Sequence, residues 1–407
     1  MTNHKLFFRL DGKGIEPELI EKFKLRNHSR NLRYSYSENC EVLNFVGFIL
    51  SDNMMLISLP KHYTTSADLV NMTESDIHLL FNVLLMDQGK NTQNYIGPIE
   101  KYESNFPFKS FYSIYRYYLK YGLYKATKTV VKPGYNKKIE WKETLRKSSA
   151  IISGNNLVYI PFFSKENRQE HVFLSQCMEY AISYTLKKYS MFVKGKIPIQ
   201  NVNNYDFFSN REYIISKLKK IYSEIFKDID KQLVRDLIDF FTFLPEGGDI
   251  TIKHYNFELI WESMVEKYLN DFFVGVSNEG LVFSDKKIEG KFNFRKQVFY
   301  VDKAHPRNRL EPDHYFNDGY QQFIFDSKYY SKVRDLNHKQ VAYYTFLRKL
   351  AKQTYNALIL PTENKSSDLP TPAHFELKES FYAHPDDQIK IWEYYLNMTD
   401  AMDNYIK

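Results

Sequence analysis

Two aspartates and a lysine toward the C-terminal end of the chain have the types and spacing that hydrolysis of a phosphodiester bond needs. The segment contains, in order, Pro312-Asp313, a short loop, the apolar run Phe323-Ile324-Phe325 and then Asp326-Ser327-Lys328. Two carboxylates can share one divalent metal ion, and Lys328 points to the same face of a strand as Asp326 because side chains alternate along a strand. A metal ion, an activated water and a positive charge beside the phosphate are the minimum parts for this reaction.

These residues predict a site for Mg²⁺, or for Mn²⁺ in its place. Mg²⁺ takes a few carboxylate oxygens together with oxygens of water and phosphate, so Asp313 and Asp326 are expected ligands and the backbone carbonyl of Ser327 could add one. Lys328 would position the attacking water and offset charge on the phosphate. The plainer alternative is that Asp326 ends a strand and pairs with Lys328 without any catalytic role.

Polar residues on two predicted helices could complete the site. In the helix expected at 335–352, Gln340 and Tyr344 are four positions apart and share one face, from which they could reach DNA or the attacking water. In the helix expected at 256–273, an acid recurs every four positions, and Glu262 is the candidate for a third acidic group because it follows Trp261 in the apolar stripe. The alternative for Glu262 is an ordinary solvated helix acid.

The elements that must position these residues predict an α/β unit with a mixed central sheet. Apolar periodicity gives helices at 256–273, 335–352 and 389–404, and strands at 281–283, 321–326, 357–360 and 375–377, with a further strand ending at 300–301. A helix, three strands, a helix and another strand are typical of this class.

The preceding part is predicted to be α+β at the N-terminus and helical in the middle. It contains a first strand in residues 1–10, a hairpin at 42–59, helices at 73–85 and 108–121, a β-rich segment at 128–163 and helices over most of 166–244. The run Pro245-Glu246-Gly247-Gly248-Asp249 is the clearest breaker. We therefore predict a β-rich N-terminal region at 1–163 for DNA binding or partner docking, a helical middle region at 164–248, and a domain at 249–407 that carries the site.

The order of these motifs resembles the PD-(D/E)XK nuclease superfamily over residues 256–360. A helical Glu, Pro-Asp, Asp-x-Lys and a Gln-x-x-x-Tyr helix follow one another as in that superfamily. The resemblance implies a restriction-endonuclease-like fold with metal binding at Asp313 and Asp326 and catalysis at Lys328. It gives the role of the helical acid to Glu262, and accessory positions to Gln340 and Tyr344.

Short segments elsewhere resemble the LlaJI-type restriction endonucleases, which are related to McrC. They are Leu59-Pro60-Lys61-His62-Tyr63, Ile139-Glu140-Trp141-Lys142-Glu143-Thr144 and Phe257-Glu258-Leu259-Ile260-Trp261-Glu262-Ser263-Met264. The resemblance implies a nuclease subunit that acts on double-stranded DNA with a separate McrB-like AAA+ GTPase or other NTPase. The sequence fits that division of labour, because it lacks a Gly-x-x-x-x-Gly-Lys-Ser/Thr motif of its own. A homodimer through the nuclease domain is a further expected assembly.

Composition and charge fit a DNA-binding protein of the cytoplasm. The chain has 407 residues and a net charge of +7, with lysine-rich clusters at 125–147, 187–196 and 217–220. Such clusters suit a phosphate backbone, although a solvated surface is the alternative for each. Cys40 and Cys177 are far apart, which indicates a reducing compartment without a disulfide framework or zinc site. No apolar run is long enough to predict a membrane span.

The leading hypothesis is therefore a metal-dependent endodeoxyribonuclease subunit of a restriction or phage-defence system. Two alternatives remain open on the sequence. One is a standalone nuclease of repair, recombination or transposition. The other is a DNA-binding adaptor that keeps an inactive nuclease fold, against which the presence of Asp313, Asp326 and Lys328 together argues.

Overall fold

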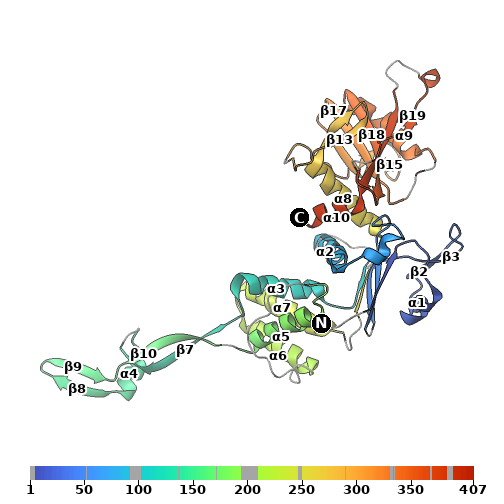
Figure 1. Ribbon diagram of the computed structural model, residues 1–407. Helices are drawn as coiled ribbons and strands as arrows, with labels where there is room; N and C mark the ends of the chain where they lie inside the picture. Colours follow the sequence, from blue (N-terminus) through green and yellow to red (C-terminus); the bar gives the residue numbers. More distant parts are fainter. Residues whose placement is uncertain are drawn as a thin grey trace. The chain divides into compact units, whose positions relative to one another are not determined.

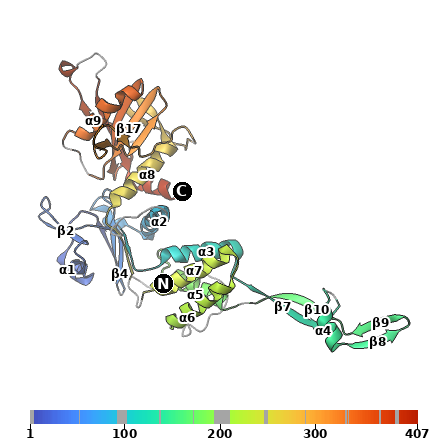
Figure 2. The ribbon, with the colours of Figure 1, turned by 180° about the vertical axis from the view of Figure 1, so that it is seen from behind.

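The structure is a computed structural model with two compact units, each mixed α/β. It describes residues 5–51, 53–91, 102–135, 138–170, 172–193, 210–245, 250–288, 290–330, 333, 335–366, 369–382 and 388–407. Unit 1 joins Met1–Phe106 to Pro245–Lys407, and unit 2 is Pro107–Leu244. Figures 1 and 2 show both units from opposite sides, and each unit is described by itself below.

The first sheet of unit 1 is assembled from distant parts of the chain. Its order is β1 (Lys5–Leu10), β5 (Met54–Leu59), β4 (Val46–Ser51), β11 (Ile250–His254) and β6 (Tyr102–Ser104). The β4–β5 hairpin and the strand near the N-terminus occur as predicted, whereas β11 was not predicted. β11 runs antiparallel to both β4 and β6. Gly47 permits this pairing, because a Cβ there would lie 2.0 Å from the carbonyl oxygen of Ile252.

Helices and a second hairpin accompany the first sheet. They are α1 (Pro17–Lys22), β2 (Leu32–Ser35), β3 (Cys40–Leu43) and α2 (Glu74–Asn91). Leu19 and Ile20 of α1 share one buried apolar cluster with Ile49 and Leu56 of the sheet. α2 confirms the predicted helix at 73–85 and packs against the C-terminal helix of the chain.

The second sheet of unit 1 is mixed, as predicted. Its order is β16 (His314–Asn317), β17 (Gln321–Ser327), β18 (Gln353–Thr362), β20 (Lys390–Asn397) and β19 (Ala373–Glu376). The three central strands are parallel, and the two edge strands run antiparallel to their neighbours. Two short antiparallel pairs lie outside this sheet: β12 (Phe273–Ser277) with β13 (Gly280–Phe283), and β14 (Phe299–Tyr300) with β15 (Arg309–Leu310).

The two faces of β17 pack against different elements because its side chains alternate. Phe323 and Phe325 contact Phe273, which follows α8 (Phe257–Phe272) directly. Ile324 clusters instead with Tyr343 of α9 (His338–Leu347). Strand β17 is therefore buried on both sides, and the residues at its carboxyl end extend from the centre of the core.

The predicted helix at 389–404 is wrong in its first half. Residues Lys390–Asn397 form β20, which pairs in parallel with β18, and only Met398–Ile406 form a helix, α10. A fully buried strand and a buried helical turn have the same apolar signal, so periodicity alone could not separate them. Asn397 starts the helix, because its side chain accepts a hydrogen bond from the Asp400 backbone N–H at 2.9 Å.

The helix predicted at 335–352 is shorter than expected. α9 ends at Leu347 and a 3₁₀ turn follows at Arg348–Leu350, so that β18 begins at Gln353, before the predicted strand. Among the helices that the structure describes, none is long and apolar enough to span a membrane.

Unit 2 combines a helical bundle with a β-stranded arm. The bundle contains α3 (Phe108–Tyr121), α5 (Phe173–Lys188), α6 (Arg211–Glu224) and α7 (Asp228–Phe243). The arm contains β7 (Ala126–Pro133), α4 (Trp141–Lys147), β8 (Ser149–Ser153), β9 (Asn156–Ile160) and β10 (Phe163–Glu170). The helix α4 within the predicted β-rich segment, and the extension of β10 to Glu170 in the predicted helical segment, differ from the prediction.

The two units divide the chain differently from the three predicted domains. The predicted division after residue 163 falls at the start of β10, inside unit 2, and residues 250–254 belong to the first sheet of unit 1. The breaker at Gly247-Gly248 lies outside the described residues, as do Lys137, Lys194 and Lys196 of the basic clusters.

Candidate functional site

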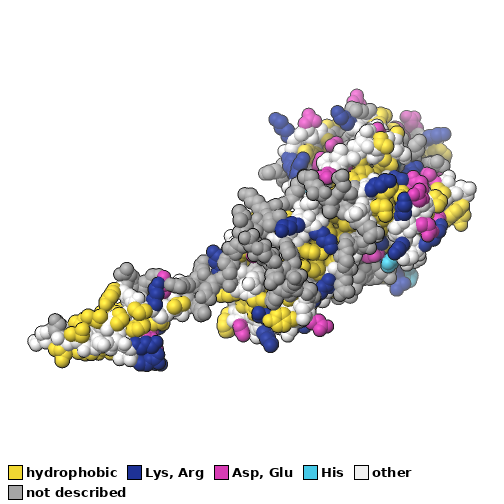
Figure 3. Space-filling model, turned by 60° about the horizontal axis from the view of Figure 1, so that its bottom comes forward, with side chains coloured by type: hydrophobic (Ala, Val, Ile, Leu, Met, Phe, Trp, Pro, Cys, Tyr) yellow, Lys and Arg dark blue, Asp and Glu magenta, His cyan; other side chains and the backbone are white. Residues whose placement is uncertain are grey.

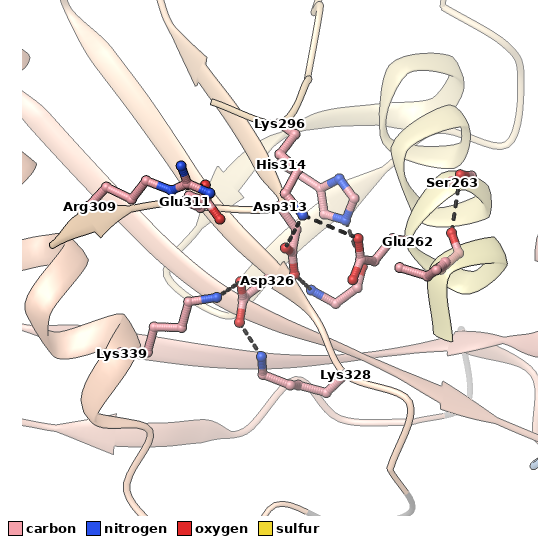
Figure 4. A network of polar contacts seen from close by, with 12 residues as sticks. Glu262, Ser263, Lys296, Arg309, Glu311, Asp313, His314, Asp326, Lys328 and Lys339 are labelled. Carbon is pink, nitrogen blue, oxygen red and sulfur yellow. Dashed lines mark hydrogen bonds and ion pairs between the residues drawn. The ribbon is translucent and has the colours of Figure 1, made fainter. Parts of the chain in front are cut away.

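Strands β16 and β17 bring Asp313 and Asp326 together. His314 is opposite Phe325 in the antiparallel pair, so continuing the register by one residue places Asp313 opposite Asp326. Both carboxylates are buried, Asp326 completely. An Asp313 oxygen accepts a hydrogen bond from the Ser327 backbone N–H at 3.1 Å, which fixes its carboxylate beside the end of β17 (Figure 4).

Lys328 lies on the same face of β17 as Asp326, as the two-residue spacing predicts. Its ammonium group donates a hydrogen bond to Asp326 Oδ2. Lys339, from the first turn of α9, approaches Asp326 Oδ1 at 3.6 Å. The carboxyl end of β17 therefore presents one buried carboxylate between two lysine side chains (Figure 4).

Lys296 connects Asp313 to Glu262 on α8. Its Nζ atom lies 3.7 Å from Asp313 Oδ1 and 3.6 Å from Glu262 Oε2. The position of Lys296 follows from its neighbour Arg295, whose backbone forms a bridge with Tyr315 on the outer edge of β16. Glu262 is half-buried and reaches the site from the helix, so the structure brings all three predicted acids into one network.

The two aspartates share their charge unequally. Burial raises the pKa of Asp313 to about 7, and repulsion from Asp326 and a hydrogen bond with it act in the same direction. Burial also acts to raise the pKa of Asp326, but Lys328, Lys339 and the hydrogen bond with Asp313 together hold it below its usual value. The pair therefore keeps one proton, on Asp313, until the solution is near neutral.

His314 is a structural neighbour of the acids. Its Nε2 atom shares a hydrogen bond of 2.6 Å with the Ser327 hydroxyl, which ties β16 to β17 beside the site. Complete burial lowers the pKa of His314 to about 3, so the ring is neutral at physiological pH. A neutral, buried imidazole positions the strands and is not available to exchange protons with solvent.

Helix α9 also carries a buried amide, on the residue that follows Lys339. The side chain of Gln340 is fully buried, and within the described residues neither its oxygen nor its nitrogen has a hydrogen-bond partner. The backbone of Gln340 is held by Asn356 of β18, whose amide donates to its carbonyl at 2.9 Å. An unpaired buried amide is unfavourable in a purely structural helix, so a polar partner such as water is expected there.

The charges of the acids act on Tyr343 of α9. Burial raises the pKa of Tyr343, and the charges of Asp326 and Asp313 raise it further. Tyr344 is buried on the same helix, four residues after Gln340 as predicted. The charges of the two aspartates therefore act on the residue next to the one that the sequence indicated.

The backbone carbonyl of Ser327 lies opposite a residue that has no N–H group to donate a hydrogen bond. Continuing the β16–β17 register places Pro312 opposite Ser327. Proline has no backbone N–H, so it cannot complete the ladder there. Pro312 therefore donates no backbone hydrogen bond to the Ser327 carbonyl.

The oxygen atoms of Asp313, Asp326 and Ser327 are suited to a hard divalent cation that needs few protein ligands. Asp326 Oδ1 is buried and receives no hydrogen bond from any N–H donor of the described residues. In the same part of the chain, no group of three or more His, Cys, Asp or Glu side chains could hold a metal ion. Mg²⁺ commonly uses one or two carboxylates and completes its shell with water and substrate oxygens, so two aspartates and a carbonyl suit it.

Sequence reasoning missed two lysines of the site, Lys296 and Lys339. Lys339 precedes the predicted Gln340 directly, and its position in the first turn of the helix was a usable signal. Lys296 lies in an irregular segment, and only the bridge between Arg295 and Tyr315 brings it to Asp313. No local pattern in the sequence reports that bridge.

No family model and no curated protein match the sequence. A chain of the refined half-complex from the tetradecameric assembly of Thermococcus gammatolerans McrB AAA+ hexamers with bound McrC matches with a TM-score of 0.41 and 14% identity, over 99% of this chain and 98% of that chain. A chain of the cryo-EM structure of the T. gammatolerans McrBC complex matches with a TM-score of 0.27 and 12% identity, over 65% of this chain and 88% of that chain. Likeness at this level carries no argument about function, which rests on the geometry of the site.

Proposed function

We propose that this chain is the Mg²⁺-dependent endodeoxyribonuclease subunit of a restriction or phage-defence system, with a PD-(D/E)XK domain of the McrC-like, LlaJI-type kind. The observation that carries the proposal is the buried pair Asp313 and Asp326, with Lys328 on the same face of the strand. A purely structural pair of buried acids is unfavourable, because one of them must stay protonated or find a cation. Double-stranded DNA is the proposed substrate.

Asp313, Asp326 and the Ser327 carbonyl would bind the ion. Glu262 would be the third acidic group of the metal site. Bound there, Mg²⁺ or Mn²⁺ supplies charge stabilisation for the phosphate and a water of lowered pKa. Asp326 is held ionised by Lys328 and Lys339, so one ligand is charged over the whole neutral range. Asp313 becomes fully charged only above its raised pKa of about 7.

The lysines and the amide would act on the phosphate and the attacking water. Lys328 is mostly buried and already fixed to Asp326, so it can neutralise charge that develops on the phosphate without reorganising. Lys339 and Lys296 have half-exposed side chains that can turn from the carboxylates to a bound phosphate. Gln340, with its unpaired amide, is suited to orient a water, and Tyr344 would shape the same side of the site.

Plasmid cleavage tests the assignment. With Mg²⁺ present and the AAA+ partner and GTP or ATP added, Lys328→Ala and Asp326→Asn should slow cleavage about 100-fold or more, because each removes a charge from the reacting centre. Asp302→Asn is the matched control, since Asp302 is a partly exposed carboxylate that accepts local hydrogen bonds from Ala304, His305 and Asn308. If the two site variants cut as fast as this control, the assigned site is wrong.

The β-stranded arm of unit 2 supports the proposal that a separate AAA+ GTPase or NTPase docks on this chain. Ile152 of β8 and Leu157 of β9 are a directly opposed pair, and both are exposed, at 79% and 55%. Trp141 and Leu145 of α4 are also more than half exposed. Figure 3 shows apolar side chains gathered on the arm, and contiguous exposed apolar surface is typical of protein interaction sites.

Gel filtration with an AAA+ NTPase encoded beside the gene tests the docking surface. The double variant Ile152→Asp with Leu157→Asp should lose co-elution, because it places two carboxylates in an apolar contact. Lys142→Ala changes a neighbouring charged residue on α4 and should co-elute like wild type. Co-elution of the double variant at wild-type level would remove the arm from the interface.

One observation favours the adaptor alternative. Lys296, Lys328 and Lys339 face Glu262, Asp313 and Asp326 in equal number, so once Asp313 is ionised the network is neutral without a metal ion. A neutral network can be stable in a protein that binds no metal. Calorimetry separates the two functions: heat of binding with Mn²⁺ at up to millimolar concentration supports the nuclease, and its absence supports the adaptor.

A further inference from the structure

Two polar cavities of unit 1 share a wall next to the candidate site. One has a volume of about 360 Å³ and the other about 490 Å³. Asp11, Arg33, Lys61 and Tyr329 line both, so the cavities form one groove, called the basic groove below. Because Tyr329 follows Lys328 directly in the chain, the groove lies beside the carboxyl end of β17.

Hydrogen bonds hold the residues that line the basic groove in place. The loop after β5 contacts residues just after β17 and β18, two of the three central parallel strands of the second sheet. The Lys61 backbone N–H donates to the Tyr329 hydroxyl at 2.7 Å, and His62 contacts Glu363, just after β18, at 3.0 Å. Tyr329 is buried, and the Lys61 ammonium lies 4.7 Å from the centre of its ring. A ligand in the groove is therefore held at a set distance from the catalytic strand.

Two arginines of the groove have unused hydrogen-bonding capacity. Arg30 and Arg33 are exposed, and within the described residues neither guanidinium group forms a hydrogen bond or an ion pair. Arg30 lies over the Tyr255 ring at 4.4 Å, which orients it by a cation–π contact. A guanidinium group has five N–H donors in a planar fork that matches the oxygens of a phosphate.

Each acid of the groove has a partner of its own, and the guanidinium donors of Arg30 and Arg33 are not among the hydrogen-bond partners that hold these acids. Asp11 lies 3.8 Å from the Lys61 ammonium, Glu38 is 2.9 Å from Lys13, and Glu363 is held by His62. Glu258 accepts a hydrogen bond of 3.0 Å from the side chain of Asn256. The remaining lining includes hydroxyl groups such as those of Thr64 and Ser66. Arginine, lysine and hydroxyl side chains together are the usual partners of a nucleic-acid backbone.

We propose that the basic groove binds the sugar-phosphate backbone of the DNA that is cut, with Arg30 and Arg33 as phosphate ligands. The inference rests on the proposed nuclease function and adds to it a surface that holds the strand beside Lys328. The groove contacts phosphates only, so it contributes affinity and register without selecting a sequence.

The test is DNA binding by the full-length protein without cleavage. Fluorescence anisotropy of a labelled duplex, measured in Ca²⁺ over a range of salt concentrations, gives the Kd and its salt slope. The double variant Arg30→Ala with Arg33→Ala should weaken binding about 10-fold or more and reduce the slope of log Kd against log salt by about 2, one for each lost phosphate contact. Arg30→Lys with Arg33→Lys should recover part of the affinity.

Lys5→Ala is the matched control, because Lys5 is an exposed lysine at the other end of β1 and lines neither cavity. It should leave Kd and slope unchanged, and circular dichroism should show all variants folded. Wild-type Kd and slope in the double alanine variant, or no DNA binding by the wild type, overturn the inference. So does a variant that loses binding of a labelled nucleoside triphosphate while keeping DNA, since the groove then holds a nucleotide.

The nuclease proposal and the basic-groove proposal can be refuted independently of each other. If the wild type binds DNA through the arginines but does not cut with metal and partner present, the nuclease assignment fails and the groove stands. If Asp326→Asn abolishes cleavage while the double arginine variant binds and cuts like wild type, the groove fails and the nuclease stands.

Discussion

At the scale of single residues, the site depends on two carboxylates that are not both charged below neutral pH. Asp326 is held ionised by Lys328 and Lys339, so the proton of the pair resides on Asp313. A cation must displace that proton, and binding of the cation is therefore coupled to pH. This coupling gives the site a signature that can be measured without substrate.

Affinity for Mn²⁺ should be about 10-fold higher at pH 8 than at pH 6, as measured by calorimetry on the full chain. The raised pKa of Asp313, about 7, means that its carboxylate is mostly protonated at pH 6 and mostly ionised at pH 8. Asp313→Asn should bind weakly at both values and lose this pH dependence, whereas Asp302→Asn should behave like wild type. Equal affinity of the wild type at the two pH values would contradict the assignment of Asp313 as a ligand.

Gln340 offers a test that separates function from stability. Replacing its unpaired buried amide by an apolar side chain of similar size removes a desolvation penalty of roughly 1–3 kcal/mol. Gln340→Leu should therefore leave the free energy of unfolding unchanged or raise it, measured by urea titration, while DNA cleavage slows.

Gln353→Leu, at the exposed start of β18, is the control and should not affect cleavage. A Gln340→Leu protein that is less stable than wild type would show that the amide has a structural partner after all.

At the scale of elements, the loop that follows β5 anchors strand β17. It bonds to Tyr329, just after β17, and to Glu363, just after β18, so one loop holds the ends of two neighbouring parallel strands. Lys328 lies between the buried end of β17 and this anchor. Its geometry is therefore set by the first sheet of unit 1 as well as by the second.

Tyr329→Phe should destabilise unit 1 by about 1–3 kcal/mol, because the buried Lys61 N–H loses its acceptor while the ring still fills its place. Chemical denaturation with fluorescence detection measures the change. Tyr330→Phe alters the adjacent tyrosine, which is exposed, and should change stability by less than about 0.5 kcal/mol. Equal effects of the two substitutions would mean that the anchor does not hold the strand.

β17, α8 and α9 beside the site could be predicted from local sequence, whereas β16, which positions Asp313, was expected as a short loop. Residues 323–325 are an apolar run that follows the turn at Asp318-Gly319 and ends at Asp326, a pattern typical of a buried strand. Residues 390–397 have a similar apolar pattern without a terminating signal, and parallel pairing with β18 decides their conformation. β11 and Lys296 depend entirely on partners far away in the chain, so no window of sequence contains the information.

At the scale of the whole molecule, unit 1 is built from both ends of the chain and unit 2 interrupts it. The interruption occurs between adjacent antiparallel strands: Ser104 of β6 is opposite Ile252 of β11, and Asn105 bonds to Thr251 at 3.2 Å. The two points where the chain leaves and re-enters unit 1 are therefore neighbours in one ladder.

Unit 1 should fold without unit 2 when Phe106 is joined to Ile250 through Asn-Gly. Two residues of this type form a tight hairpin turn between antiparallel strands. The shortened protein should unfold in one cooperative transition by circular dichroism and bind Mn²⁺ with the affinity of the full chain, but it should lose the AAA+ partner together with the arm. A shortened protein that aggregates or unfolds without cooperativity would show that unit 1 needs unit 2 for its stability.

The same ladder constrains the order of events on the ribosome. Strand β11 pairs with both β4 and β6, and it is synthesised only when the ribosome reaches residues 250–254. Until then, β4 and β6 each have an unpaired edge while unit 2 is being synthesised. Exposed edges invite pairing with other nascent chains. Fragments that stop before β11 should therefore precipitate or bind chaperones, and premature termination within unit 2 cannot release a folded N-terminal sheet. Because the second sheet is translated later still, its acids are completed only after the first sheet can close.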